Sequence, residues 1–394
     1  MISAKEQPGT TPFNADPLAG QMLDADAHMY LTAEQMLETL GDLGASPDNY
    51  EFFKTYPSSE EYKERRLIAR EKLWEVKGMA ALGAVDPVER REAIDLMGMR
   101  SQLMFSNVEK EMRVDSQAAR EATSRYNDFV LDFARASDSK GRARAVCHMN
   151  MHDPEWACKE LDRLLKKGAL AVTLPCHAPP AGVSPSHSVW DPFWARLEEA
   201  RVPATLHLAN AGLLYCRTPE DLMFPNPAWG ESETLRQAPA MRAGGEEAIS
   251  PYFMLVTHMA PEIWLQTMVM GKVFERFPHL AFGIIELGAS WLGPAVERMD
   301  LWSDFMNKVG VKYDMKPSEY VRRNVRITPF WHENLPLMVE RYGLKECYCF
   351  STDYPHLEGG KDPIGIFRKH LRKLDPSYDR MFFAENAKTL FPGL

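Results

Sequence analysis

The stretch CYCFSTDYPHLEGG, residues 347–360, contains a short apolar run that ends abruptly in polar residues. Residues 347–350 are apolar, which is typical of a short strand buried on both faces. Pro355 cannot donate a backbone hydrogen bond, so strand pairing is expected to stop soon after this run. The pattern predicts that Asp353 lies just beyond the carboxyl end of a strand.

Seven further apolar runs of strand length occur in the chain, and helix-like segments separate most of them. The eight predicted strands are 22–25, 101–105, 143–149, 170–174, 203–208, 281–285, 325–328 and 347–350. Helical segments at 153–168, 191–202 and 334–345 begin with Asp-Pro or Asn, and two of them stop at Gly. Strands that alternate with helices pair in parallel, and eight such units favour a distorted (β/α)8, TIM-like barrel over an open sheet.

Two stretches are longer than a minimal barrel requires. Residues 31–98 form a charged, helix-rich insertion after the first strand, and residues 209–256 form a loop excursion rich in Pro and Gly after the fifth. Long ordered loops in a compact domain usually cover or wall a binding site. We therefore expect a flexible N-terminal arm over 1–20 and a single barrel domain over 21–394, with both long stretches shaping its site.

Composition and charge narrow the possible partners. The 394 residues carry a formal charge of −9, which argues against nucleic acid because binding to phosphates needs clustered Lys and Arg. No signal peptide and no apolar run of about 18 residues is present, so no membrane partner is expected. The six cysteines are scattered without a C-x-x-C pair, which indicates reduced thiols in a cytoplasmic protein.

Acidic and imidazole side chains follow several predicted strands. Asp24, Asp26 and His28 end the first strand, and His207, Glu286 and Asp353 follow the fifth, sixth and eighth. Since the carboxyl ends of barrel strands share one rim, these groups are expected to converge. Imidazole nitrogens and carboxylate oxygens suit a divalent ion such as Zn²⁺, and a metal-bound water is a strong nucleophile.

Each residue alone also has a simpler interpretation. An Asp after a strand is most often a turn or helix cap, which applies to Asp353. A single His in an apolar run, such as His207, is more often a hydrogen-bonded core residue than a ligand. The pair Asp26 and His28 forms a D-x-H pattern that arises often by chance. Only their shared position at strand ends makes metal binding the better interpretation.

The motifs DADAH, LHLANAG, GKVFERFPHLAFGIIELGASWLGPAVERMD, FSTDYPH and ENAKTLF resemble the amidohydrolase-2 family over roughly residues 22–392. This family contains metal-dependent hydrolases and decarboxylases, including aminocarboxymuconate-semialdehyde decarboxylase. The resemblance implies a distorted TIM-like barrel in which Asp26, His28, His207 and Asp353 bind the metal. It also implies that Asp353 activates water or transfers a proton. His258, in VTHMAPE, matches a histidine of the hydrolase-like branch that would face the pocket, although a surface position is an equally good interpretation.

Two positions depart from the family pattern. Glu286 stands where the decarboxylases place a histidine, and a carboxylate cannot polarise a carbonyl as an imidazolium does. Glu286 could instead be a base, a further metal ligand or a bridge to a second ion, or it could simply pair with Arg or cap a helix. Leu31 replaces a Glu that the family often carries after the first histidine. We therefore expect hydrolysis rather than decarboxylation.

The sequence thus predicts an enzyme in which one divalent ion, Zn²⁺ with Mn²⁺ or Fe²⁺ as alternatives, activates water for attack on a carbonyl-type carbon. The expected substrate is small and aromatic or apolar, and the residues expected to contact it are His177, Trp331, His332 and His356. Asp353, Glu286 and His258 are the expected catalytic residues. The alternatives are a nonoxidative decarboxylase of an aromatic acid, a dinuclear iron oxygenase on the same barrel, and a non-catalytic binding protein. By the same resemblance, a homodimer is expected.

Overall fold

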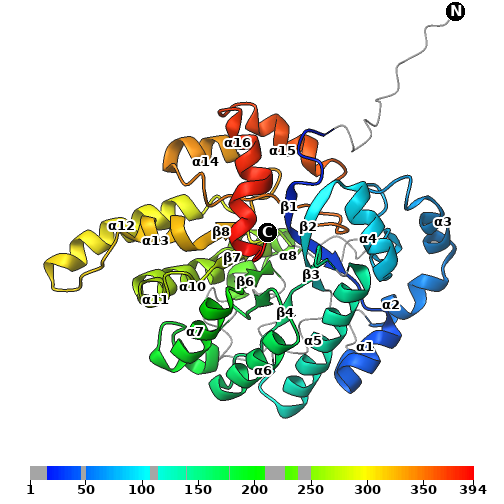
Figure 1. The fold of residues 1–394 in the computed structure, drawn as a ribbon, viewed down its shortest axis with the longest axis horizontal. Helices are drawn as coiled ribbons and strands as arrows, with labels where there is room; N and C mark the ends of the chain where they lie inside the picture. Colours follow the sequence, from blue (N-terminus) through cyan, green and yellow to red (C-terminus); the bar gives the residue numbers. More distant parts are fainter. Residues whose placement is uncertain are drawn as a thin grey trace, which may run out of the picture.

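We describe a computed structural model of the chain over residues 16–45, 50–106, 114–138, 140–176, 178–208, 227–237 and 250–394. Strands occupy the centre, and helices surround them (Figure 1). None of the helices in these ranges is long and apolar enough to span a bilayer.

The strands form two sheets in which every pairing is parallel. The first sheet contains β1 (Met22–Met29), β2 (Met99–Ser106) and β3 (Ala143–Ala145). The second contains β4 (Cys147–His148), β5 (Val172–Thr173), β6 (Ala204–His207), β7 (Phe282–Ile285) and β8 (Val325–Ile327). Parallel pairing in chain order confirms the predicted α/β class.

The single strand predicted at 143–149 is divided between the two sheets. The amide of Val146 donates to the carbonyl of Met104 (3.0 Å), while the next amide, of Cys147, donates to Ala171 (3.0 Å). The chain therefore changes partners between neighbouring residues. Hydrogen bonds link the two sheets at this point, which is one source of the barrel's distortion.

The predicted last strand, 347–350, forms only an isolated bridge between Tyr348 and Ile327. Ile327 donates to the carbonyl of Cys347 (2.8 Å), and on the other side Ala25 donates to the carbonyl of Phe350 (3.1 Å). The segment thus lies between β8 and β1, where an eighth barrel strand would lie. The pairing of β1 with β2 is also irregular, with a shift of register between Asp24 and Ala27.

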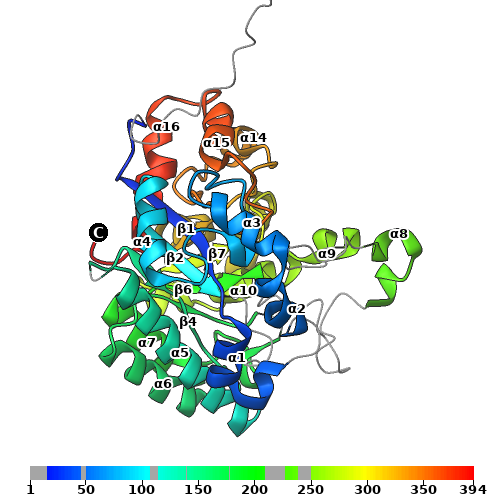
Figure 2. The ribbon, with the colours of Figure 1, turned by 90° about the vertical axis from the view of Figure 1, so that its right-hand side faces the viewer.

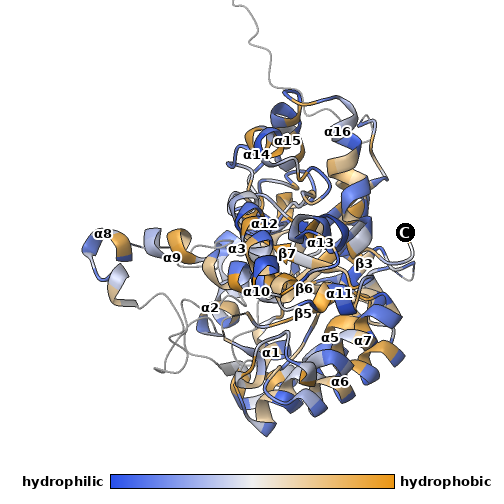
Figure 3. Cartoon of the chain, turned by 90° about the vertical axis from the view of Figure 1, so that its left-hand side faces the viewer, coloured by the Kyte–Doolittle hydropathy of each residue, from blue (hydrophilic) through white to orange (hydrophobic). Residues whose placement is uncertain are grey.

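Helices alternate with the strands, and each of the three predicted helical segments contains one. The helices after β2 include α5 (Gln117–Ser137), α6 (Pro154–Lys166), α7 (Asp191–Ala200), α10 (Met259–Met270), α11 (Val273–Arg276), α12 (Leu292–Lys308), α13 (Pro317–Asn324), α14 (Leu335–Tyr342), α15 (Pro363–Leu371) and α16 (Ser377–Arg380). Asp153 caps α6 by accepting bonds from two amides of its first turn. Hydrophilic and hydrophobic residues alternate along these helices, as expected when one face packs inward (Figure 3).

The insertion after β1 is helical, as predicted. It contains α1 (Ala33–Leu40), α2 (Tyr50–Thr55), α3 (Glu60–Ile68), a short 3₁₀ turn η4 (Gly78–Ala80) and α4 (Pro87–Leu96). Most of the predicted excursion at 209–256 lies outside the described residues. Its described parts include α8 (Glu233–Arg236) and α9 (Pro251–Val256). In Figure 2, α2, α8 and α9 lie on the side toward which β1 runs, and the C terminus lies on the opposite side.

The C-terminal segment packs against the strands. Ala387, Leu390 and Phe391 are buried in a small apolar cluster with strand residues such as Leu23, Leu103 and Ile285. The C terminus appears over the centre of the strands in Figure 1. Of the predicted N-terminal arm, residues 16–20 are described: Leu18 is buried, and Asp16 pairs with Arg368 (2.7 Å).

Candidate metal centre

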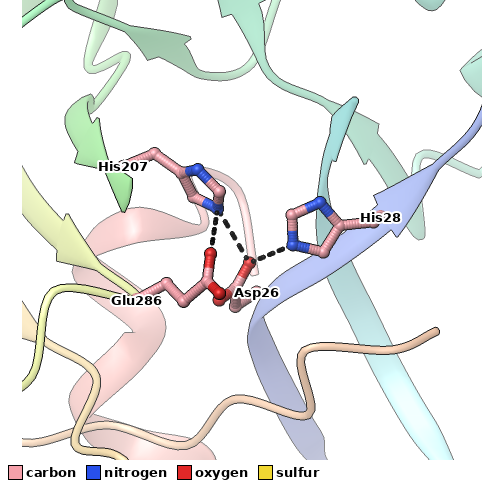
Figure 4. Close-up of side chains that lie close together, drawn as sticks. All are labelled: Asp26, His28, His207 and Glu286. Carbon is pink, nitrogen blue, oxygen red and sulfur yellow. Dashed lines mark hydrogen bonds and ion pairs between the residues drawn. The ribbon is translucent and has the colours of Figure 1, made fainter. Parts of the chain in front are cut away.

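Five side chains from four segments of the chain meet in one cluster. Asp26 and His28 belong to β1, His207 is the last residue of β6, Glu286 directly follows β7, and Asp353 follows the irregular segment at 347–350. Figure 4 shows four of them converging, with His28 and His207 on either side of Asp26. The strand-end argument therefore placed these residues in one neighbourhood.

The contacts within the cluster are short. Nε2 of His28 lies 3.2 Å from Oδ1 of Asp26 and 3.2 Å from Oδ1 of Asp353. Nε2 of His207 lies 3.4 Å from Oδ1 of Asp26 and 3.3 Å from Oε2 of Glu286. Each imidazole thus directs its Nε2 atom at two carboxylates, which is the arrangement expected where these groups share a cation.

Burial and charge make a cation the natural centre of this cluster. The exposed fractions are 1% for Asp26, 5% for Glu286 and 8% for Asp353. Three buried carboxylates so close together repel one another unless positive charge lies between them. Among the described residues, no Lys or Arg forms an ion pair with Asp26 or Asp353. The donor set of imidazole nitrogens and carboxylate oxygens fits a divalent metal ion.

Two overlapping groups of potential ligands are present, and they favour one ion. In each group all ligand atoms lie within 4.8 Å of one another: Asp26, His28, His207 and Glu286 form one, and His28, Glu286, Asp353 and His356 form the other. His28 faces both Asp26 and Asp353 with the same atom, Nε2. Because an imidazole nitrogen has one lone pair, this atom can bind only one cation.

The two histidines are held by aromatic contacts and by the backbone. The ring of His207 stacks on Phe105 with a centroid distance of 4.1 Å, and His28 stacks on His356 at 3.6 Å. Arg90, which is fully buried, donates a hydrogen bond to the carbonyl of His28. These contacts orient the imidazoles before any ligand binds, which preserves the geometry of a metal site.

His356 extends the cluster beyond the five strand-end residues. Its Nδ1 atom lies 3.0 Å from Oδ1 of Asp353. Burial raises the pKa of Asp353, but the positive charge of His356 and the hydrogen bond with His28 outweigh it and hold that pKa well below its usual range. For His28, burial lowers the pKa, and the bonds with Asp26 and Asp353 raise it overall.

A buried network around Asp24 fixes the two segments that carry the ligands. Oδ1 of Asp24 accepts a hydrogen bond from the amide of Thr352 (2.8 Å), and Oδ2 accepts from the Thr352 hydroxyl (2.6 Å) and from Gln102 (2.7 Å). Burial raises the pKa of Asp24 to about 7. Asp24 therefore ties β1, β2 and the 351–354 turn together, and its role is structural.

Two of the carboxylates sit on unusual backbone. Glu286 has φ of 56° and Asp353 has φ of 52°, in the left-handed region that disfavours residues with a Cβ atom. Such conformations cluster at functional sites because the surrounding structure must hold them. Here the amide of Glu286 donates to the hydroxyl of Thr328 (2.9 Å), and the amide of Asp353 donates to the carbonyl of Asp26 (2.9 Å).

An apolar pocket opens beside the carboxylates. Its polar wall includes Asp26, Glu286 and Asp353, and its apolar wall consists of Pro329, Phe330, Trp331, Pro363 and Phe367. The indole nitrogen of Trp331 donates to the carbonyl of Glu358 (2.9 Å), which holds that ring in place. The pocket combines flat apolar surfaces with a metal-binding edge.

The four residues predicted to contact substrate, and His258, which was predicted to be catalytic, do not all lie at the site. Trp331 lines the pocket and His356 touches Asp353. His332 stacks on Phe330 at 5.4 Å and is absent from the pocket lining. His258 is partly exposed, with Nε2 3.9 Å from a carboxylate oxygen of Glu262, and belongs to neither ligand group. His177 lies outside the described residues.

Several residues that contribute to the site were not predicted from the sequence. Phe105 and Arg90 support the two histidines, and Lys77 lies buried near Asp353. Lys77 is the one lysine in the otherwise apolar run VKGMAALGAV of the helical insertion. A single lysine in an apolar run indicates a buried charge. The sequence does not show which groups surround that charge, because they come from distant parts of the chain.

Comparisons with known proteins agree with this geometry. The amidohydrolase family model matches residues 25–393. An amidohydrolase of Mycobacterium avium subsp. paratuberculosis is 21% identical, with a TM-score of 0.69 over 94% of this chain and 98% of that one. A 5-carboxyvanillate decarboxylase of Novosphingobium aromaticivorans with bound manganese is 19% identical (TM-score 0.59; 94% and 96% covered). A dihydroxybenzoic acid decarboxylase of Polaromonas sp. JS666, also with manganese, is 18% identical (TM-score 0.58; 94% and 96% covered).

The family match covers nearly the whole chain, and these solved structures share its distorted barrel. The predicted family resemblance and the predicted TIM-like fold are both confirmed. The protein belongs to the amidohydrolase family and is a metal enzyme of that superfamily.

Proposed function

We propose that this protein is a nonoxidative decarboxylase that removes CO₂ from a small aromatic carboxylic acid. The observation that carries the proposal is the pocket in which Phe330, Trp331 and Phe367 face the carboxylate edge of the metal centre. Flat apolar walls suit an aromatic ring, and the metal edge suits its oxygen substituents. The similarity to manganese-containing decarboxylases of hydroxylated benzoic acids supports this choice over the hydrolysis expected from the sequence.

We propose Mn²⁺ as the metal in place of the zinc expected from the sequence. The donor set contains three carboxylates and two imidazoles, and carboxylate oxygens suit a harder ion than the nitrogen- and sulfur-rich sites typical of zinc. Asp26, His28, His207, Asp353 and Glu286 would hold it. When bound, the ion would supply Lewis-acid polarisation of the substrate's oxygen atoms.

In this proposal, Asp353 and His356 move the proton. Decarboxylation breaks the bond between the ring carbon and the carboxylate, and the electron pair stays on that carbon while CO₂ leaves. The carbon must then receive one proton. Asp353 is ionised because its pKa is held low, so the proton must come from another group. Asp353 lines the pocket and contacts Nδ1 of His356 at 3.0 Å, where it can pass a proton from the protonated imidazole to the ring carbon.

Hydrolysis remains the second candidate because of Glu286. This carboxylate lines the pocket and lies 3.3 Å from His207, where it could act as the base that deprotonates water. The dinuclear iron alternative has less support, because the shared Nε2 atom of His28 favours one ion.

The test is a direct comparison of products. Protein loaded with Mn²⁺ is incubated with carboxylated phenols and, separately, with aryl esters and lactones, and CO₂ and acid release are measured. We expect CO₂ release that Asp353→Asn lowers by about 10²-fold or more, as for loss of a group that transfers a proton. Glu199→Gln, an exposed change on α7, serves as control. Ester or lactone cleavage without CO₂ release would establish hydrolysis instead.

A further inference from the structure

The carboxylate of Glu333 joins two loops that border the candidate metal centre. Its Oε1 atom accepts hydrogen bonds from the amides of Ala289 (3.0 Å) and Ser290 (2.7 Å), and its Oε2 atom accepts from the amides of Ala289 (2.9 Å) and Phe330 (2.8 Å). Hydrogen bonds to a charged acceptor are roughly twice as strong as those between neutral groups. Glu333 therefore links the loop that follows β7 to the loop that follows β8, and the proposed reaction gives it no role.

The loop after β7 begins with Glu286, one of the candidate metal ligands. Because its backbone is left-handed, with φ of 56°, Glu286 keeps this conformation only where other groups hold the loop. The hydroxyl of Thr328 accepts from the amide of Glu286 (2.9 Å). Further along the same loop, Glu333 accepts from the amides of Ala289 and Ser290. Glu333 thus holds the far end of the loop that carries this ligand.

The loop after β8 carries the aromatic wall of the pocket. Phe330 and Trp331 line the pocket together with Glu286. Glu333 makes a second bond to this loop, because its own amide donates to the carbonyl of Phe330 (3.0 Å). The two loops also touch, since a Cβ atom added at Gly288 would lie 3.3 Å from Cε2 of Phe330 and 3.4 Å from Oε1 of Glu333. The positions of the aromatic wall and of Glu286 are therefore linked through Glu333.

We propose that Glu333 is a positioning residue that sets the spacing between the ring of Phe330 and the candidate metal ligand Glu286. This inference rests on the proposed function, in which an aromatic acid lies against Phe330 and directs its oxygen atoms at the metal. Among the described residues, Glu333 belongs neither to the pocket lining nor to the ligand groups, so it acts through the two loops. A shift of either loop changes the distance between the surface that receives the ring and the edge that receives the oxygen atoms.

The first arm of the test measures metal binding, which requires no substrate. Mn²⁺ dissociation constants are determined by calorimetry on metal-free wild type, Glu333→Gln, Glu286→Gln and the double variant. Gln keeps the size of Glu but replaces one acceptor oxygen by an NH₂ group, which cannot accept from the loop amides. We expect Glu333→Gln to weaken Mn²⁺ binding about tenfold where Glu286 is present, as for a group that orients a ligand. In the Glu286→Gln background the loss should be less than about twofold.

The second arm measures the binding of an aromatic acid in the same way. Dissociation constants of 2-hydroxybenzoate are determined on Mn²⁺-loaded wild type, Glu333→Gln, Phe330→Ala and the double variant, at equal metal content. We expect Glu333→Gln to weaken binding about fivefold or more where Phe330 is present, and less than about twofold in Phe330→Ala, because residues that act together are not additive. Glu340→Gln, an exposed change on α14, is the matched control and should alter neither dissociation constant.

Two results would overturn the proposal. Equal losses with and without the partner residue, in either arm, would show that Glu333 only supports the fold in general. Unchanged dissociation constants in Glu333→Gln would show that the loops keep their spacing without it. Coupling between Glu333 and Glu286 in a protein that does not bind 2-hydroxybenzoate would count against the proposed reaction and would still support Glu333 as a positioning residue.

Discussion

Replacing Lys77 by Met is predicted to stabilise the protein at neutral pH. The change removes the buried ammonium group and keeps an unbranched side chain that fills the same space. Burial lowers the pKa of Lys77 from 10.5 to about 8, despite the opposing attraction of Asp353 and Glu358. The folded protein therefore holds this proton less tightly than the unfolded chain does.

The size and the pH dependence of this stabilisation follow from the difference between the pKa of Lys77 in the folded protein and in the unfolded chain. The gap between 10.5 and about 8 corresponds to roughly 3 kcal/mol of unfolding free energy at neutral pH, at about 1.4 kcal/mol per pH unit. Between these two values the unfolded chain binds more protons, so the stability of the wild type rises with pH. The advantage of Lys77→Met should therefore be largest at pH 7 and fall by roughly half at pH 9.5.

The assay is urea-induced unfolding followed by tryptophan fluorescence at both pH values, with equal metal content in the two proteins. Lys72→Met, whose amine is exposed, should change the unfolding free energy by no more than about 0.5 kcal/mol. A Lys77→Met protein that is less stable than the wild type at pH 7, or whose gain in stability is the same at both pH values, would contradict this prediction. The expected gain would show that burial of this lysine lowers the stability of the protein.

Three further predictions concern the metal centre and its supports. Thr352→Val removes the hydroxyl that donates to Asp24 and should lower the unfolding free energy by about 1–3 kcal/mol. Urea unfolding measures this loss, and a smaller loss would contradict the structural role of the Asp24 network. Because Glu286 has positive φ, Glu286→Gly should be more stable than Glu286→Ala by about 1 kcal/mol, and the opposite order in thermal unfolding would argue against strain there. His207→Ala and Asp353→Ala should each reduce bound metal in elemental analysis, and the mononuclear site is wrong if both retain the wild-type content.

Matched controls keep these predictions specific. Thr267→Val removes a hydroxyl on α10 that bonds only to backbone carbonyls, so it should change stability less than Thr352→Val. His279→Ala and Asp304→Ala, at exposed residues that belong to neither ligand group, should retain the wild-type metal content. Treatment with a chelator should likewise remove metal from the wild type and lower its melting temperature, since a ligand that binds only the folded state stabilises it.

The fold class and most residues of the candidate metal centre could be predicted from the amino-acid sequence alone. Apolar runs that alternate with capped helices are local patterns, and they led to parallel strands at 22–25, 203–208 and 281–285 near their observed positions. Asp26, His207 and Asp353 could be predicted to lie close together because every strand of a parallel barrel ends at the same rim. That rule depends only on where each strand stops, which the sequence indicates well.

The neighbours that surround those residues became known only from the folded chain. Asp24 and Thr352 are 328 positions apart, and nothing in either local sequence indicates that one cross-links the other. The splitting of 143–149 between two sheets and the left-handed backbone of Glu286 and Asp353 likewise arise from packing against distant segments. The same holds for Lys77, whose burial depends on how the helical insertion folds back against the turn at Pro355. Local patterns set secondary structure, whereas the energy of a buried charge depends on all the groups that the fold brings around it.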